Sequence, residues 1–219
     1  MVWVGIIGAE AYIANALSKL IASHPAAQIS TFFSESQLSD CTSEKYYKWS
    51  MFDAIEKSDI IFNGLPHKNS GSIISEAVKQ GKKVIDISDD NSAAMNKGEL
   101  SASPVYGIPE LNKENIMNAF VVSNPSCYCT GAMLGLAPLV HGKLIDMKSV
   151  IIDSKAGVTS LSKTDKLVES FLDNNESVKA YKLGRDNHSI EIEQQVGNLF
   201  GEKIGVFYTP YIVPMNKGI

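Results

Sequence analysis

The sequence predicts an α/β protein with a parallel sheet, because short apolar runs with the composition of strands alternate with segments of helical periodicity. The first apolar run covers Met1 to Gly8 and ends in a glycine. From Tyr12 to His24, apolar side chains recur every three or four residues, which is the spacing of an amphipathic helix. Pro25 then ends the helical pattern. We therefore expect a buried strand, a tight turn and a helix at the start of the chain.

Four more apolar runs in the first part of the chain have the length and composition of buried strands. They cover Ile29–Phe33, Asp59–Gly64, Lys83–Ile87 and Phe120–Ser123. Between the second and third of these runs, Ser70–Gln80 has helical spacing and is closed by Gly81. Strands that follow one another through helices form βαβ units, so these runs are expected in one parallel sheet.

A change in character after Asn124 predicts a domain boundary. A proline and two cysteines precede a helix of small residues, Thr130 to Val140. Four segments of a second domain follow it: a strand at Ser149–Asp153, a polar segment at Ser154–Arg185, an acidic amphipathic run at Glu191–Leu199, and Val206–Ile219, where apolar residues alternate with prolines. We expect a first domain at residues 1–124 and a second domain at residues 125–219.

The composition argues against several classes of partner. The chain has 219 residues, of which 44% are hydrophobic, and 20 Lys and Arg against 24 Asp and Glu give a net charge of −4. This is the wrong sign for neutralising nucleic-acid phosphates. No apolar run approaches the about 20 residues of a membrane-spanning helix, and no secretion signal is present. Three cysteines cannot all pair within one chain. We expect a soluble cytoplasmic protein with reduced thiols, which binds neither nucleic acid nor membrane.

A glycine-containing turn joins the first predicted strand to the first helix. Its spacing is G-x-x-G, and alanines stand where further glycines of a dinucleotide motif would be expected. The N–H groups at a helix start can bind a pyrophosphate. A tight turn without any ligand remains the alternative. The residues predicted to contact a cofactor here are Gly5, Gly8, Ala9, Glu10, Ala11, Tyr12 and Ile13.

Two later segments are also cofactor candidates. Glu35 ends the second predicted strand, where an acid accepts hydrogen bonds from the adenine ribose and repels a 2′-phosphate. This favours NAD over NADP, although neighbouring serines offer hydroxyls to a phosphate. Leu65, Pro66 and His67 follow the Asp59–Gly64 strand at its carboxyl end, where parallel sheets bind ligands.

Cys127 lies in the turn before the helix of small residues. A helix N-terminus favours the thiolate over the thiol, so Cys127 is a candidate nucleophile. A small buried apolar residue is the equally open alternative. Cys129 is a second thiol that would protect or oxidise Cys127. No pair of cysteines or histidines elsewhere has ligand spacing, so no metal site is predicted.

A nucleophilic thiol usually works with a base, and His188 is the preferred candidate among the four histidines. It precedes an acidic helix, and Glu191 follows it by three residues, which places a carboxylate to orient the imidazole. A helix-start residue without a catalytic role is the alternative.

Taken together, these residues resemble the N-acetyl-γ-glutamyl-phosphate reductase family, the arginine-pathway branch of the semialdehyde dehydrogenase superfamily. The matching blocks occur in family order: Val4–Ala9, Leu65–His67, Val84–Ser88, Val105–Asn112, Asn124–Tyr128, Asp153–Gly157, Ala180–Lys182, His188 with Glu191–Gln194, Tyr208–Pro210 and Val213–Ile219. The resemblance implies a Rossmann domain followed by an α/β dimerisation and catalytic domain. It also implies NADP as the cofactor and a homo-oligomer, either a dimer or a tetramer.

The resemblance further implies the chemistry. Cys127 matches the cysteine that attacks an acyl phosphate, expels phosphate and forms a thioester, which hydride then reduces to the semialdehyde. His188 matches the histidine that handles protons. The substrate residues expected to accompany Glu191 are Lys155, Lys182 and Arg185, which suit an acidic phosphorylated substrate. Each of these three bases is equally interpreted as a solvated loop charge.

Departures from the family pattern leave alternatives open. Ala11, Ala14 and Ser126 stand where family members carry glycines, and Tyr211 stands where they carry a histidine. The chain also ends earlier than the family does, so the second domain is expected to be incomplete. One alternative is a degenerate, weakly active or inactive relative that binds a nucleotide or a partner. Another is the related acyl-phosphate reductase of lysine synthesis, whereas the block Tyr106–Glu110 argues against aspartate-semialdehyde dehydrogenase.

Overall fold

The computed structural model describes residues 1–8, 11–33, 51–65, 67–88, 102–158, 174–181, 183, 187–201 and 203–219, with backbone alone at 11, 12 and 67–69. These residues form two compact units, Met1–Pro125 and Ser126–Ile219. Each unit has a sheet of its own, of six strands in the first and three in the second. Among the described helices, none combines the length and the apolar character that crossing a membrane requires.

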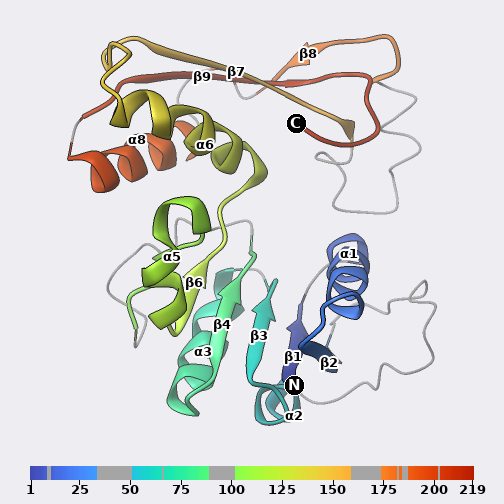
Figure 1. The fold of residues 1–219 in the computed structure, drawn as a ribbon. Coiled ribbons are helices and arrows are strands. Elements are labelled where there is room, and N and C mark those ends of the chain that lie inside the picture. Colours follow the sequence, from blue (N-terminus) through green and yellow to red (C-terminus); the bar gives the residue numbers. More distant parts are fainter. Residues whose placement is uncertain are drawn as a thin grey trace. The chain divides into compact units, whose positions relative to one another are not determined.

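The first unit is built on a parallel sheet with the strand order β2-β1-β3-β4-β6-β5 (Figure 1). Its strands are β1 (Val2–Ile7), β2 (Ala27–Phe33), β3 (Ile60–Asn63), β4 (Lys83–Asp86), β5 (Val105–Tyr106) and β6 (Val121–Ser123). The chain adds β2 on one side of β1 and then β3 on the other. The order therefore reverses at β1, which is the point where open α/β sheets bind ligands.

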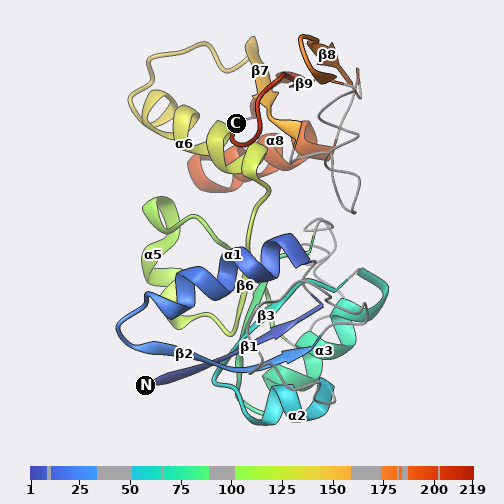
Figure 2. The ribbon, with the colours of Figure 1, turned by 90° about the vertical axis from the view of Figure 1, so that its right-hand side faces the viewer.

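Helices cover both faces of this sheet (Figure 2). They are α1 (Ala11–Ala22), α2 (Met51–Glu56), α3 (His67–Lys79) and α5 (Pro109–Asn118). Strand β1 alternates between two buried clusters: Val4 and Ile6 pack with α1, whereas Ile7 packs with α2 and α3. Because both faces are buried, the strand consists almost entirely of apolar residues.

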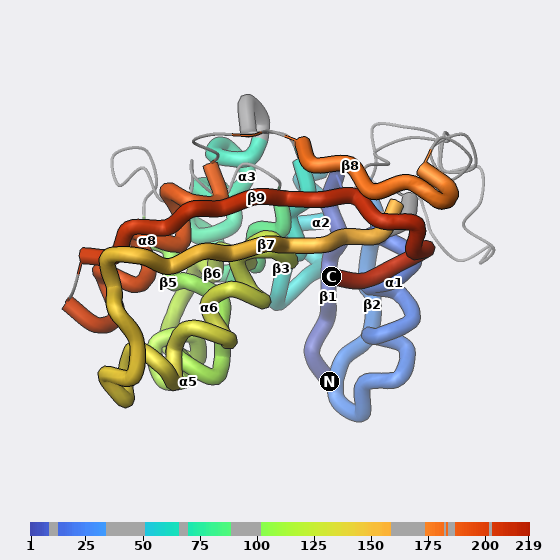
Figure 3. The backbone as a smooth tube through the Cα atoms, turned by 90° about the horizontal axis from the view of Figure 1, so that it is seen from above, coloured from blue at the N-terminus to red at the C-terminus, as the bar shows by residue number. Residues whose placement is uncertain are grey.

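The second unit has a sheet in the order β7-β9-β8 and two helices. Its elements are α6 (Cys127–His141), β7 (Val150–Ala156), β8 (Lys179–Ala180), α8 (Asn187–Phe200) and β9 (Val206–Ile212). Strands β7 and β9 run parallel and side by side along their whole length (Figure 3). Both helices lie on one face of this sheet (Figure 1).

Alternation along β7 and β9 separates the two faces of the second sheet. Ser154 and Tyr208 are buried and point toward the helices, whereas Ile151, Lys155 and Phe207 are exposed on the other face. Residues Ile151 and Phe207 are directly opposite each other in the register. The outer face of the sheet therefore carries an exposed apolar pair.

The α/β prediction with a parallel sheet in the first part of the chain is confirmed. The predicted helix starts were wrong in three places, because α3 begins at His67, α6 at Cys127 and α8 at Asn187. The first turns of these helices lack the apolar periodicity from which their starts were predicted. The helix α1 ends at Ala22, two residues before the predicted end.

Four described elements were missed by the sequence analysis: α2, β5, α5 and β8. Helix α5 buries none of its residues, so it has no apolar stripe to reveal it. Strands β5 and β8 have two residues each, which is too short for a recognisable alternation. The polar segment predicted at Ser154–Arg185 also contains the last three residues of β7.

We predict that Gly8→Ala destabilises the protein more than Gly81→Ala does. Both glycines have positive φ, of 67° and 72°, which costs an alanine about 1 kcal/mol. A Cβ on Gly8 would also overlap the side chain of Leu65, whereas a Cβ on Gly81 meets no described atom within 4 Å. Overpacking should add about 1–3 kcal/mol to the loss at Gly8. Urea unfolding measures both, and equal losses would contradict the packing role of Gly8.

Candidate functional site

Backbone hydrogen bonds join the carboxyl end of β1 to the carboxyl ends of β2 and β3. Gly8 N donates to Phe33 O at 2.8 Å, and Gly64 N donates to Ile7 O at 2.7 Å. Leu65, which is 2% exposed, packs against Gly8 at this edge. Helix α1 begins three residues after Gly8, at Ala11. This strand, turn and helix present backbone N–H groups at the sheet's reversal point, which suits a dinucleotide pyrophosphate.

A buried polar network lies beside this edge. Asn63 Nδ2 donates to Ser70 Oγ at 2.6 Å and to Asp86 Oδ1 at 3.1 Å, and Ser88 N donates to the same carboxylate oxygen at 3.3 Å. The network links the ends of β3 and β4 to the first turn of α3. Asn63 Oδ1 is buried and has no hydrogen-bond partner among the described residues. A bound group that carries a donor would satisfy it, so these residues fit a polar cofactor.

The predicted cofactor residues divide into three groups. Gly8 and Leu65 are brought together, and Ile13 is exposed near the start of α1. Gly5 lies inside β1, where its missing Cβ leaves room for Ser58 Oγ, so the structure explains this glycine by packing. The remaining predictions lie outside the described residues or side chains: Ala9, Glu10, Glu35 and Pro66 entirely, and Ala11, Tyr12 and His67 for their side chains.

The start of α6 is fixed by a serine cap. Ser126 is the N-cap residue, and its Oγ accepts a hydrogen bond from Cys129 N at 3.2 Å. Ser126 O also accepts from Thr130 N at 2.9 Å. These two bonds satisfy helix-start donors and make Cys127 the first residue of the helix.

Cys127 is exposed, whereas Cys129 is buried. Cys127 therefore does not serve as a small buried apolar residue. At the first position of a 15-residue helix, its sulfur lies at the positive end of the helix dipole. That environment favours the thiolate, which is the nucleophilic form.

His188 is the second residue of α8 and contacts the two residues that follow Cys127. Its ring centroid lies 5.2 Å from that of Tyr128, with the planes at 72°. Its carbonyl oxygen accepts a long hydrogen bond from the Cys129 thiol, with 4.0 Å between sulfur and oxygen. Within the second unit, the predicted nucleophile and the predicted base are therefore joined through Tyr128 and Cys129.

Two further tyrosines complete this arrangement. Tyr208 of β9 lies 5.6 Å from the His188 ring and 6.0 Å from the Tyr128 ring, between centroids. The hydroxyl oxygens of Tyr128 and Tyr181 lie 2.6 Å apart in a hydrogen bond. We call these four residues, Tyr128, Tyr181, His188 and Tyr208, the aromatic cluster. The three tyrosines lie within sequence blocks that resemble the family, but no role was predicted for them.

The predicted substrate residues are only partly placed. Glu191 lies one turn after His188 on α8. Lys155 is not brought to Cys127 or His188, because alternation along β7 puts it on the outer face of the sheet, where its Nζ lies 5.1 Å from the centroid of the Tyr211 ring. Lys182 and Arg185 lie outside the described residues. The described parts of the chain contain no group of three His, Cys, Asp or Glu residues that would hold a metal ion.

Two family models match most of the chain. The model described as "Semialdehyde dehydrogenase, NAD binding domain" matches residues 3–119, and the model described as "Semialdehyde dehydrogenase, dimerisation domain" matches residues 127–219. A protein from Caldicellulosiruptor bescii named N-acetyl-gamma-glutamyl-phosphate reductase is 37% identical over 240 residues, which cover 100% of this chain and 70% of that protein. The protein of the same name from Campylobacter jejuni is 36% identical over 236 residues, which cover 99% and 69%.

Solved structures show the same fold at low identity. Aspartate semialdehyde dehydrogenase II from Vibrio cholerae has a TM-score of 0.71 and 14% identity, covering 98% of this chain and 71% of that chain. The structure of aspartate semialdehyde dehydrogenase with NADP from Candida albicans has a TM-score of 0.64 and 14% identity, covering 98% and 68%. These similarities confirm the fold class, a Rossmann-like domain followed by a dimerisation domain.

We predict that the Ser126 cap stabilises the start of α6 without requiring a particular side-chain size. Ser126→Ala should lower the free energy of unfolding by about 1 kcal/mol, and Ser126→Gly by roughly a few tenths of a kcal/mol. Urea unfolding measures both variants. Ser149→Ala is the control, because Ser149 is exposed and precedes β7. An alanine variant as stable as the parent protein would contradict the cap.

Proposed function

The chain belongs to the semialdehyde dehydrogenase family, and from that premise we propose that it is an NADP-dependent N-acetyl-γ-glutamyl-phosphate reductase. Such an enzyme reduces N-acetyl-γ-glutamyl phosphate to N-acetylglutamate 5-semialdehyde, a step of arginine biosynthesis. The observation that carries the proposal is the exposed Cys127 at the start of α6, with His188 held by the next two residues. Relatives that carry this enzyme name, at 37% and 36% identity, support the substrate.

Cys127 is proposed to act as the nucleophile. Its thiolate forms a bond from Sγ to the acyl carbon, and the bond between that carbon and the phosphate oxygen breaks. Phosphate leaves with the electron pair, and the acyl group remains on Cys127 as a thioester. Two lower barriers thereby replace one high barrier. The helix dipole at the start of α6 lowers the free energy of the attacking thiolate.

His188 is proposed to handle the protons. It accepts the proton of the Cys127 thiol and passes it to the departing phosphate. When bound, a reduced nicotinamide cofactor supplies a hydride ion to the thioester carbon. The carbon–sulfur bond then breaks, the aldehyde is released, and a proton from solvent reaches the Cys127 sulfur through His188. One proton and one hydride are consumed in each turnover.

The cofactor is proposed to bind at the carboxyl edge of the first sheet. The turn at Gly8, the start of α1 and the adjacent Leu65 would hold the pyrophosphate and the neighbouring groups, and Asn63 Oδ1 is an acceptor for a cofactor donor. The family resemblance and the relative solved with NADP support NADP. Glu35 favours NAD on charge grounds but lies outside the described residues, so both dinucleotides belong in the test.

The substrate's negative charges are proposed to meet Lys182 and Arg185, as point charge and fork respectively. Glu191 is proposed to orient His188 from the next turn of α8. Lys155 is left out of this proposal because it lies on the outer face of the second sheet.

A homo-oligomer is proposed to form through that outer face. Ile151 and Phe207 are 74% and 68% exposed, and they are directly opposite each other in the register of β7 and β9. No described helix of the second unit covers them (Figure 1). The match to a dimerisation domain over residues 127–219 supports a second copy of this chain as the partner.

We predict that Cys127→Ser abolishes turnover while leaving cofactor affinity nearly unchanged. The assay is phosphate- or arsenate-dependent reduction of NADP⁺ by N-acetylglutamate 5-semialdehyde, the reverse of the proposed reaction. Loss of the nucleophile should lower kcat by about three orders of magnitude or more. Calorimetry with NADP⁺ and NAD⁺ measures the affinity. Cys41→Ser is the matched control and should retain activity.

Three outcomes would contradict this proposal. Equal losses of turnover and affinity in Cys127→Ser would make the thiol structural. An unaltered chain that oxidises a different semialdehyde but not the N-acetylated one would rule out the substrate. No binding heat with either dinucleotide would exclude the cofactor site.

We also predict that Ile151→Lys dissociates the oligomer. A lysine would replace apolar contact with a charge that loses water on assembly, which should raise the dissociation constant about a hundredfold or more. Analytical ultracentrifugation measures the assembly state. Leu144→Lys is the control, because Leu144 is 72% exposed but lies outside β7 and β9. If Ile151→Lys assembles like the parent chain, the outer face is not the interface.

A further inference from the structure

The residue that follows the proposed nucleophile has contacts on two sides. Tyr128 is 5% exposed, and its ring meets the His188 ring in an edge arrangement at 5.2 Å between centroids. Its hydroxyl is hydrogen-bonded to the Tyr181 hydroxyl, with 2.6 Å between the oxygens. A buried tyrosine hydroxyl requires a hydrogen-bond partner, and here the partner is a second tyrosine from a distant segment of the chain. Tyr128 therefore contacts the proposed base through its ring and Tyr181 through its hydroxyl.

We propose that Tyr128 is a positioning residue. Its ring fixes the orientation of the His188 imidazole, and its hydroxyl fixes Tyr181, which directly precedes Lys182. The expected effects of Tyr128 variants on turnover rest on the proposed function. The positioning of the His188 ring rests only on contacts within the second unit.

Two aromatic rings pack against the imidazole of His188. Tyr128 and Tyr208 approach its imidazole from two different elements, with interplanar angles of 72° and 37°. Two rings at different angles restrict rotation of the imidazole more than one ring would. The Cys129 thiol bonds the His188 carbonyl oxygen, so the backbone of the same residue is also held. The Tyr128 ring and the Cys129 thiol both belong to the turn of α6 that carries Cys127, whereas the Tyr208 ring belongs to β9.

A shared turn gives this arrangement a mechanical consequence. Cys127, Tyr128 and Cys129 are consecutive residues of one helix, so a displacement of α6 carries the nucleophile and both constraints on the base together. These two contacts tie the position of His188 to that of Cys127. Misplacement of reacting groups by about 1 Å can cost a hundredfold in rate, so such a link affects catalysis directly.

Tyr181, the hydrogen-bond partner of the Tyr128 hydroxyl, is held at both its backbone and its side chain. Tyr181 N donates to Pro210 O at 3.1 Å, which anchors the residue to β9 just after β8. The phenol–phenol bond anchors the other end of Tyr181 to α6. Lys182 is the next residue in the sequence and Arg185 follows three residues later, so this bond fixes the described residue that precedes the proposed substrate-binding residues. Loss of the hydroxyl should weaken substrate binding, whereas loss of the ring should slow the chemical step.

The first test needs no substrate. NMR signals of the His188 ring protons, assigned by comparison with His188→Asn, report the neighbouring ring through its ring current. Tyr128→Leu should shift these signals, and Tyr128→Phe, which keeps the ring, should leave them near their original positions. Unchanged signals in Tyr128→Leu would overturn the positioning of His188, whether or not the chain is a reductase.

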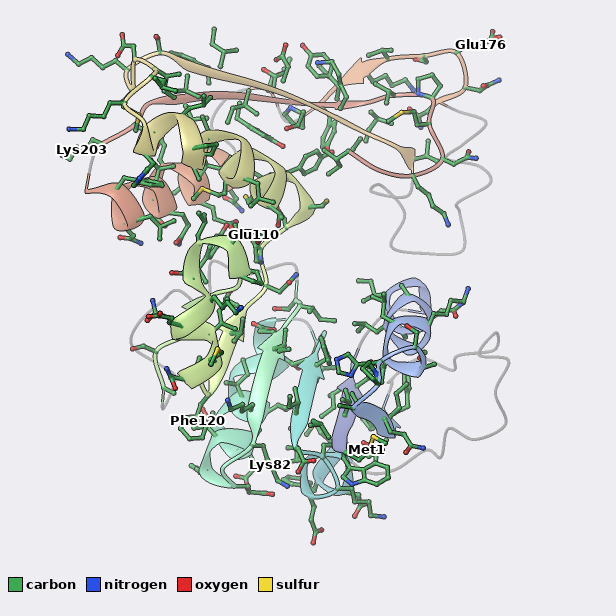
Figure 4. The ribbon with its side chains drawn as sticks, viewed as in Figure 1. Met1, Lys82, Glu110, Phe120, Glu176 and Lys203 are labelled. Carbon is green, nitrogen blue, oxygen red and sulfur yellow. The ribbon has the colours of Figure 1, made fainter. Side chains whose placement is uncertain are left out.

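The second test uses the proposed reaction. Tyr128→Leu removes both the ring and the hydroxyl, so it should lower kcat about a hundredfold and raise KM by the same factor as Tyr128→Phe. Tyr128→Phe and Tyr181→Phe each remove the same hydrogen bond, so each should raise KM by a similar factor with kcat nearly unchanged. The double phenylalanine variant should be no worse than either single variant, because both changes delete one interaction. Phe120→Leu is the control for removing an aromatic ring, since Phe120 lies outside the cluster, just before β6 (Figure 4).

The outcomes distinguish the positioning of His188 by the Tyr128 ring from the positioning of Tyr181 by the Tyr128 hydroxyl. If Tyr128→Leu fails to fold, the two phenylalanine variants still test the hydroxyl, and additive effects on KM would overturn that part of the proposal. Equal kcat for Tyr128→Leu and the parent chain would overturn positioning for catalysis. A parent chain without activity that shows the expected NMR shifts would overturn the proposed function and retain the positioning of His188.

Discussion

The capped first turn of α6 is the constraint on which the proposed site depends. The Ser126 hydroxyl fixes where the helix begins, and the helical advance then sends three consecutive side chains in three directions. Cys127 faces outward, Tyr128 meets the His188 ring, and Cys129 meets the His188 carbonyl. A helix starting at Thr130, as the apolar periodicity predicted, would have left all three in a loop. The proposed nucleophile and the proposed base are thus linked through the first turn of one helix.

A comparable constraint organises the edge of the first sheet. Gly8 allows the chain to turn with positive φ directly against Leu65, which keeps the ends of β1 and β3 close together. The network of Asn63, Ser70 and Asp86 fixes the neighbouring ends of β3 and β4. Packing explains both glycines of the motif, since Gly5 leaves room for Ser58 and Gly8 for Leu65. Any cofactor contact made at this edge uses a turn that the fold already requires.

The first sheet was largely predictable because helices cover both of its faces, so that its strands have clear apolar runs. Helix α5 was not, since it buries none of its residues. In the site, the chemistry of Cys127 and His188 marked them as candidates, but their connection was not predictable. It depends on the packing of α8 against α6, which brings the His188 ring to Tyr128 and the His188 carbonyl oxygen to the Cys129 thiol. Alternation along β7 puts Lys155 on the wrong face for the role it was assigned.

Ser126 bears on the hypothesis that the chain is a degenerate relative. Ser126 was one of the departures from the family pattern that left this hypothesis open. The structure turns the Ser126 hydroxyl back to Cys129 N, where it caps the helix that carries the proposed nucleophile. Serine is a better cap than glycine, so this departure strengthens the start of α6. A substitution of this kind preserves the orientation of Cys127, and it weighs in favour of a retained catalytic geometry.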